Sequence, residues 1–260
     1  MNIIKIPVNN GAMEKKKGIE NAPDKIIEKT KKYYLKESGI MPLMNFDEIK
    51  VNNSNIEETN KRIEKKVSSL MLPAILLGGD HSLTYSSFKA FAKKHKNPGI
   101  LVFDAHLDCE NNFSPPTHED YLRVLIEEGH VNKDNVLVVG VRNVHINELE
   151  YSKKNKLKIY DMKEILIEGE RDVADAFMSV VKKFDALYVS VDIDVLDPAF
   201  APGTGYIEPG GLSTRQLIYF IQRLKNMNNI ELWDLVEVNP DKDISDLTVS
   251  AAAKLVVEIS

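Results

Sequence analysis

Two short stretches of this 260-residue chain place carboxylates and imidazoles at regular spacing directly after apolar runs. The first is Asp104-Ala105-His106-Leu107-Asp108, and the second is Asp192-Ile193-Asp194. If each strand stays extended through its polar residues, side chains at alternate positions project to one side, because a strand has a period of two. Aspartate and histidine are common metal ligands, so both stretches predict metal binding at a strand end.

Two further polar segments follow apolar runs in the same way. Gly78-Gly79-Asp80-His81-Ser82 comes after the run 74–77, and Glu237-Val238-Asn239-Pro240 comes after the run 232–236. In open parallel sheets, ligands bind outside the carboxyl ends of the strands. We therefore expect all four polar segments to meet at one edge of a parallel sheet.

Four carboxylates and two imidazoles from these segments are the candidate metal ligands: His81, Asp104, His106, Asp108, Asp192 and Asp194. Any one of them alone is more simply interpreted as a surface acid or a satisfied histidine, but the full set in this context is not. Buried carboxylates without counter-charge are unfavourable, and two divalent cations would neutralise four of them. Mixed carboxylate and imidazole ligation suits manganese, with zinc, cobalt or iron as substitutes. Two such ions can activate a shared water, which predicts hydrolysis.

The elements that must position these residues form an alternating pattern of short β-branched runs and longer amphipathic segments, which is typical of an α/β protein with a parallel sheet. Strands are predicted at 3–8, 44–51, 74–77, 100–103, 136–141, 158–160, 187–191 and 232–236. Helices are predicted at 22–35, 56–70, 83–95, 119–128, 171–184, 214–225 and 247–259. No linker or repeat interrupts the pattern, so we expect one domain over residues 1–260.

The composition is that of an ordinary globular protein, with 43% hydrophobic residues, 28% charged residues and a net charge of −5. The mild acidity argues against a nucleic-acid partner, and the basic run Lys15-Lys16-Lys17 is interpreted as a solvated loop. No segment approaches the ~20 apolar residues of a membrane span, and the start lacks the apolar core of a signal peptide. We therefore expect a cytoplasmic protein with no membrane partner. A single cysteine, Cys109, excludes an intramolecular disulfide and a cysteine-rich zinc site.

The motifs 78–82, 104–108 and 190–198, continued by Ala201-Pro202-Gly203-Thr204-Gly205, resemble the signatures of the ureohydrolase family. That family includes arginase, agmatinase, guanidinobutyrase and formimidoylglutamase, and the resemblance extends over nearly the whole chain. It implies a three-layer α/β/α fold around an eight-stranded parallel sheet. It also implies two Mn²⁺ ions per subunit, release of urea or a related amide from a guanidino or formimino compound, and a homo-oligomer, either a trimer or a hexamer.

The resemblance also implies roles for individual residues. One metal would be held by His81, Asp104, Asp108 and Asp192, and the other by Asp104, His106, Asp192 and Asp194. His118 stands where the family has a histidine that passes a proton to the leaving amine, although a partly exposed loop histidine is the alternative. Glu237 matches the carboxylate that orients the guanidinium. Asp80 and Asp197 would either orient the ligands or cap loops.

The chain departs from the family where the substrate would be recognised. Glu119 stands where arginases and agmatinases usually have glycine, and Tyr206 where threonine is common. Asn143 and His145 replace two aspartates of the arginase pattern, and Glu110 replaces an asparagine that helps to bind an α-carboxylate. We predict that Glu110, His145 and Tyr206 contact substrate.

A carboxylate at position 110 would repel an amino acid's carboxylate and favour a cationic tail, so agmatine is the favoured small-molecule guanidino substrate. Arginase, guanidino-acid hydrolase and formimidoylglutamase activities remain open. A metal-binding protein without activity is disfavoured because it would not need His118 and Glu237. A deacetylase-type enzyme with one zinc ion is disfavoured because it would not need His81 and Asp194.

Overall fold

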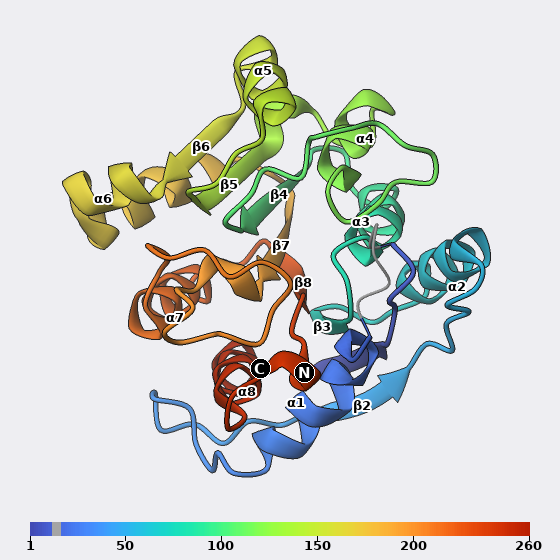
Figure 1. The fold of residues 1–260 in the computed structure, drawn as a ribbon, viewed down its shortest axis with the longest axis vertical. Coiled ribbons are helices and arrows are strands. Elements are labelled where there is room, and N and C mark those ends of the chain that lie inside the picture. Colours follow the sequence, from blue (N-terminus) through green and yellow to red (C-terminus); the bar gives the residue numbers. More distant parts are fainter. Residues whose placement is uncertain (12–16) are drawn as a thin grey trace.

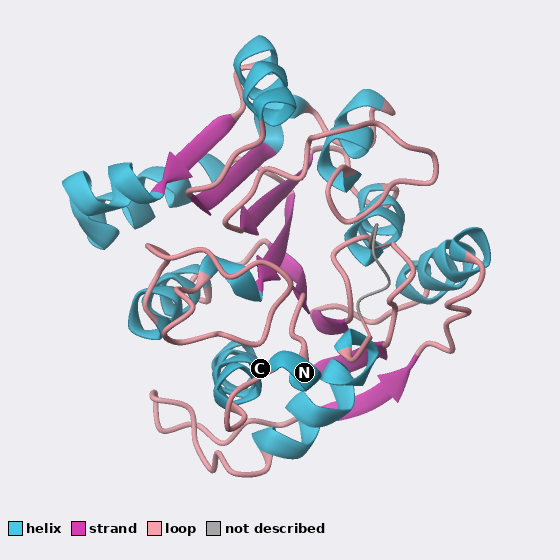
Figure 2. Cartoon of the chain, viewed as in Figure 1, coloured by secondary structure: helices cyan, strands magenta, loops and turns pink. Residues whose placement is uncertain are grey.

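The computed structural model describes residues 1–11 and 17–260, so Lys15 and Lys16 of the basic run lie outside the described residues. Eight parallel strands form one sheet in the order β2-β1-β3-β8-β7-β4-β5-β6 (Figures 1 and 2). The strands are β1 (Asn2–Ile6), β2 (Asn45–Glu48), β3 (Ala74–Gly78), β4 (Pro98–Phe103), β5 (Val136–Val141), β6 (Lys158–Asp161), β7 (Ala186–Asp192) and β8 (Ile230–Val236). The predicted eight-stranded parallel sheet is confirmed.

Helices cover both faces of the sheet, which completes the predicted three layers (Figure 2). On one face, α1 (Ala22–Thr30), α6 (Met162–Val181), α7 (Thr214–Leu224) and α8 (Leu247–Ile259) share a core with alternate strand residues such as Ile75 and Leu77. On the other, α2 (Ile56–Ser68), α3 (Leu83–Ala92), α4 (Tyr121–Glu127) and α5 (Ile146–Asn155) pack with the intervening residues, such as Ala74 and Leu76. Strands buried on both faces explain the continuous apolar runs in the sequence.

The strand order explains how distant segments of the chain meet. The chain passes from β3 to β4 and leaves two positions between them, which β8 and β7 fill later. The centre of the sheet is therefore β3-β8-β7-β4, and each of these neighbours carries one of the four polar segments at its carboxyl end. The site predicted from sequence is thus assembled from four adjacent strands.

Several helix boundaries differ from those expected. Helix α5 was not predicted, because its N-cap is a histidine, His145, whose ring accepts a hydrogen bond from the Asn147 amide while Glu148 completes a capping box. Helix α6 begins at Met162 rather than at residue 171, because Asp161 caps it and Gly169 joins two helical parts through a left-handed conformation (φ 84°). Helices α1 and α3 end earlier than predicted, at Thr30 and Ala92.

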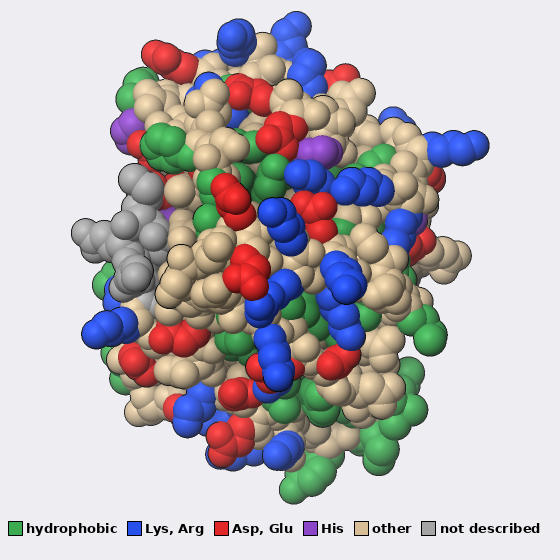
Figure 3. Space-filling model, turned by 90° about the vertical axis from the view of Figure 1, so that its right-hand side faces the viewer, with side chains coloured by type: hydrophobic (Ala, Val, Ile, Leu, Met, Phe, Trp, Pro, Cys, Tyr) green, Lys and Arg blue, Asp and Glu red, His purple; other side chains and the backbone are tan. Residues whose placement is uncertain are grey.

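The surface in Figure 3 carries lysine and arginine side chains interspersed with acidic ones over the face that is viewed. None of the helices in the described part of the chain is both long enough and apolar enough to cross a membrane.

Candidate metal centre

The polar segments turn as soon as their strands end, which corrects the expectation of an extended strand through them. Strand β4 stops at Phe103, and the His106 amide then donates to Asp104 Oδ1 at 2.7 Å. Asp108 takes a left-handed conformation (φ 49°). After β7, the Asp194 amide donates to Asp192 Oδ1 at 2.8 Å and opens a short 3₁₀ turn, Ile193–Val195. The predicted ligand side chains are therefore brought together by aspartate-capped turns, and not by the alternation of side chains along an extended strand.

His81 lies in the turn between β3 and α3, and this turn packs tightly against the end of β1. The Gly79 amide donates to Ile6 O at 3.1 Å, and the Asp80 amide donates to Val8 O at 3.0 Å. A side chain at Gly79 would put its Cβ 1.8 Å from Val8 O, so only glycine fits this close approach. The Gly-Gly pair before Asp80 thus serves to bring His81 to the carboxyl edge of the sheet.

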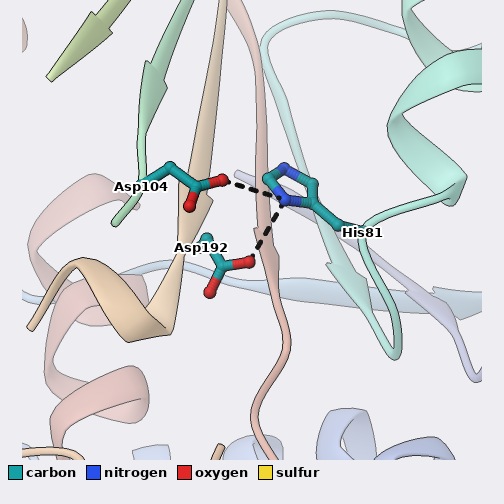
Figure 4. Close-up of side chains that lie close together, drawn as sticks. All are labelled: His81, Asp104 and Asp192. Carbon is teal, nitrogen blue, oxygen red and sulfur yellow. Dashed lines mark ion pairs between the residues drawn. The ribbon is translucent and has the colours of Figure 1, made fainter. Parts of the chain in front are cut away.

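The imidazole of His81 directs its Nδ1 atom at three carboxylates, of which Figure 4 shows Asp104 and Asp192. Nδ1 lies 3.4 Å from Asp104 Oδ2, 3.0 Å from Asp108 Oδ2 and 3.2 Å from Asp192 Oδ2. The opposite nitrogen, Nε2, is 2.8 Å from Ser190 Oγ and 3.0 Å from the Tyr121 hydroxyl. One ring nitrogen is thereby held by hydroxyl groups and the other is presented to the carboxylate cluster.

His106 repeats this arrangement on the other side of Asp104. Its Nδ1 lies 3.4 Å from Asp104 Oδ1 and 3.2 Å from Asp194 Oδ2. Its Nε2 lies 3.3 Å from Glu208 Oε2. The two oxygens of Asp104 therefore face different imidazoles, which is the geometry needed for a carboxylate that bridges two cations.

Burial and mutual repulsion change the pKa values of the acids in the cluster. Burial, with the neighbouring carboxylates second, raises the pKa of Asp108 to about 8 and raises the pKa of Asp192 well above its usual range. For His81, burial favours the neutral ring, but Tyr121 and three aspartates outweigh it and raise its pKa. Positive charge is thus favoured in this space, which is where divalent cations would be held.

The residues present fit a pair of metal ions. His81 Nδ1 and Asp104 Oδ2 are buried, and neither has a hydrogen-bond partner among the described residues. One group of ligand atoms comes from His81, Asp104 and Asp192, and a second from Asp104, His106 and Asp194; within each group the atoms lie within 4.8 Å of one another. All six predicted ligands converge here, and their individual assignments remain predictions that metal titration tests.

His118 and Glu237 lie beside this cluster and contact each other. His118 Nδ1 is 3.3 Å from Glu237 Oε1, and the same oxygen accepts a hydrogen bond from the His81 amide at 2.9 Å. Glu237 follows β8 in a left-handed conformation (φ 62°), and its amide donates to Gly79 O at 2.8 Å. His118 is buried, so the alternative of a partly exposed loop histidine does not describe it.

A cavity of about 450 Å³ opens over the centre. The predicted substrate residues Glu110, His145 and Tyr206 all line it. His145 Nδ1 lies 3.6 Å from Glu110 Oε1, and the Tyr206 hydroxyl donates to Glu119 Oε1 at 2.6 Å. The same lining includes Glu148 and Glu208, which the sequence analysis missed. Glu208 follows the Gly-Thr-Gly motif, and its position beside His106 and Asn143 depends on how that loop folds back.

Asp80 and Asp197 cap loops. Asp80 accepts hydrogen bonds from the amides of Gly11 and Ser82, both at 3.0 Å. Asp197 accepts from the amides of Ala199, Gly210 and Gly211. Of the two roles expected for these residues, loop capping is therefore the one that the hydrogen bonds support.

A parallel α/β sheet with an aspartate and histidine cluster at its carboxyl edge offers a site that could hold metal ions, and comparisons with known proteins identify the family. The Arginase family profile matches residues 1–260, and this chain belongs to that family. It is 35% identical to an agmatinase of Bacillus anthracis over 79% of this chain and 70% of that protein. It is 32% identical to a formimidoylglutamase of Halalkalibacterium halodurans over 84% of this chain and 71% of that protein.

A solved arginase from Bacillus subtilis superposes with a TM-score of 0.90 at 27% identity, covering 100% of this chain and 97% of the other. The relatives therefore carry three different activities. The family and its hydrolytic chemistry on carbon–nitrogen bonds are established by these matches, and the substrate must be argued from the cavity.

Proposed function

We propose that this protein hydrolyses the guanidino group of a small cationic molecule, most simply agmatine, and releases urea and a diamine. Agmatine and water would give urea and 1,4-diaminobutane. The observation that carries the proposal is the charge of the cavity. Its lining contains eight acidic side chains and, among the described residues, no lysine or arginine. A substrate that is cationic at both ends complements such a wall, whereas a carboxylate would be repelled by it.

Four of these acids are neither predicted metal ligands nor the predicted guanidinium carboxylate: Glu110, Glu119, Glu148 and Glu208. Glu208 faces His106, and Glu148 accepts hydrogen bonds from the amides of Cys109 and His145. Glu110 and Glu119 remain toward the substrate side of the cavity. Arginine, 4-guanidinobutyrate and formimidoylglutamate all carry carboxylates, and the described lining offers no lysine or arginine to bind them.

In the proposed hydrolysis, each set of residues has a separate role. Two manganese ions bound by the six ligands would lower the pKa of a shared water and supply the nucleophile. Glu237, which lines the cavity beside His118, would bind the planar guanidinium and so orient its central carbon. His118, held against Glu237 through Nδ1, would deliver a proton to the departing amine nitrogen as the carbon–nitrogen bond breaks.

The decisive experiment incubates the manganese-loaded protein with agmatine, arginine, 4-guanidinobutyrate and formimidoylglutamate, and measures urea or formamide. We expect the highest kcat/KM with agmatine, by at least about tenfold, because a single misplaced charge is worth that much in a dry site. A preference for any of the three carboxylates would contradict the proposed substrate. Failure to turn over any compound, with two metal ions bound per chain, would contradict the proposed enzymatic activity and favour a non-catalytic metal-binding protein.

A Glu110→Gln variant provides a matched check on the charge argument. It removes one negative charge from the lining and keeps the size of the side chain. We expect its KM for agmatine to rise and its discrimination against 4-guanidinobutyrate to weaken. Glu231→Gln, which removes the same charge outside the cavity, should change neither value.

A further inference from the structure

Glu119 and Tyr206 form a contact that joins two walls of the cavity. The Tyr206 hydroxyl donates to Glu119 Oε1 at 2.6 Å, although the two residues are 87 positions apart in the chain. Both residues line the cavity, so the contact holds two side chains together on its wall, and the pair can act jointly on a substrate that enters.

Glu119 lies at the edge of the reacting groups. Its Oε1 atom is 3.7 Å from His118 Nε2, which is too long for a hydrogen bond. Glu237 contacts the opposite nitrogen of the same ring. The carboxylates of Glu237 and Glu119 thus lie on opposite sides of the His118 ring, and each contacts one of its nitrogens. A short aliphatic chain can span that distance.

A second acid lies on the neighbouring segment. The Glu110 amide donates to the Glu119 carbonyl at 3.1 Å, so the main chains of these residues run side by side. The Glu119 side chain is 26% exposed, and no described lysine or arginine lies within ion-pair distance of it. Its carboxylate lines the cavity, where it can contact a cation that enters.

Resting on the proposed function, we propose that Glu119 is a specificity-determining residue that binds the ammonium group at the far end of the substrate, and that Tyr206 orients its carboxylate. An ammonium is a compact group with three donors, so it can bind Glu119 and still contact other acids of the cavity lining. The Tyr206 ring stacks on His118, with centroids 6.3 Å apart and an interplanar angle of 15°, which fixes where its hydroxyl points. Tyr206 thereby connects the residue that would bind the ammonium, Glu119, with the residue that would donate the proton, His118.

The test compares agmatine with n-pentylguanidine, which has a methyl group in place of the ammonium. The variants are Glu119→Gln and Tyr206→Phe, and the control is Glu127→Gln, which removes the same charge from a residue outside the cavity that pairs with Arg123. We expect Glu119→Gln to raise KM for agmatine about tenfold, which is typical of a lost charge-assisted hydrogen bond. Its KM for n-pentylguanidine and its kcat for both should stay within about twofold of the parent. Tyr206→Phe should raise KM for agmatine less, and Glu127→Gln should change nothing.

An equal loss of kcat on both compounds would mean that Glu119 acts through His118, and unchanged KM values would mean that it does not contact the tail; either result overturns the proposal. Calorimetric binding of 1,4-diaminobutane and n-pentylamine to the manganese-loaded protein separates this proposal from the proposed function. The parent should prefer the diamine and Glu119→Gln should lose that preference, even if no compound is hydrolysed. Absence of any preference in the parent overturns the tail site. Two metal ions per chain and an unchanged Tm in each variant show that the fold is intact.

Discussion

Ser190 Oγ lies 2.8 Å from His81 Nε2 and 2.6 Å from Asp234 Oδ1, and all three residues are buried. Because the Asp234 carboxylate accepts the hydroxyl hydrogen, the Ser190 oxygen is left to accept a hydrogen bond from Nε2. With the ring hydrogen on Nε2, the Nδ1 atom would be able to coordinate a cation among the carboxylates. The orientation of a predicted metal ligand is therefore held by a serine on β7 and an aspartate on β8, together with the Tyr121 hydroxyl, which lies 3.0 Å from the same nitrogen.

Ser190→Ala should weaken binding of the metal held by His81. We expect about a tenfold rise in its Kd for manganese, since residues that orient metal ligands commonly contribute tenfold or more. Metal competition with a chelating dye measures this affinity. Ser86→Ala, which removes a buried hydroxyl bonded only to a helix carbonyl, is the control and should leave the Kd unchanged. Equal affinities in Ser190→Ala and the parent would show that the hydroxyl does not orient the ring.

His118→Asn should lower turnover and leave metal binding intact. The imidazole contacts Glu237 and is not among the predicted ligands, so its loss should remove proton transfer without removing a metal ligand. A decrease in kcat of about a hundredfold or more is expected from the usual contribution of general acid–base catalysis. Urea release is measured beside the metal content of each chain. Loss of manganese from this variant would instead assign His118 a structural role.

Asp194→Asn should weaken one metal far more than the other. Asp194 contributes to the group with His106, and the group around His81 does not include it. Titration of metal-free protein should show one site near the parent affinity and a second that is weaker by about tenfold or more. Equal weakening of both sites, or of neither, would contradict the assignment of Asp194 to one ion.

Glu37→Gln should destabilise the fold at neutral pH and not in acid. Hydrogen bonding from Arg215 lowers the pKa of Glu37 to about 2, against an opposing effect of burial. Because its folded pKa lies below its unfolded value near 4.5, the pair contributes stability above that value, and the contribution is lost as the pH falls toward about 2.

The Arg215 and Glu37 side chains are 69% and 32% exposed, so we expect a decrease in the free energy of unfolding of less than about 1 kcal/mol at pH 7. Urea unfolding at pH 7, 5 and 3 should show the difference from the parent shrinking at the lowest pH. Asp24→Asn, at an exposed position in the first turn of α1, serves as a surface comparison. A difference that stays constant with pH would mean that the carboxylate charge of Glu37 is not the cause.

The sequence by itself determined the class of fold and the chemical character of the site. Apolar runs buried on both faces identify parallel strands through composition alone, and a polar residue directly after such a run must lie at the carboxyl edge of the sheet. His81, Asp104 and Asp192 could be selected on that ground, and the ligand types alone indicate divalent metal. The sheet order, by contrast, cannot be read from local sequence: no residue pattern near β3 or β4 indicates that β8 and β7 lie between them.

Tertiary structure alone decided which further residues line the cavity and which of the lining residues contact one another. Glu208 reaches His106, and Tyr206 reaches Glu119, only because the loop 197–211 folds back over the ends of the strands. The capped turns at Asp104 and Asp192 likewise replaced the extended geometry that alternation suggests. Such contacts arise from long-range packing and strand order, whereas residue type and periodicity report only on a chain segment and its immediate neighbours.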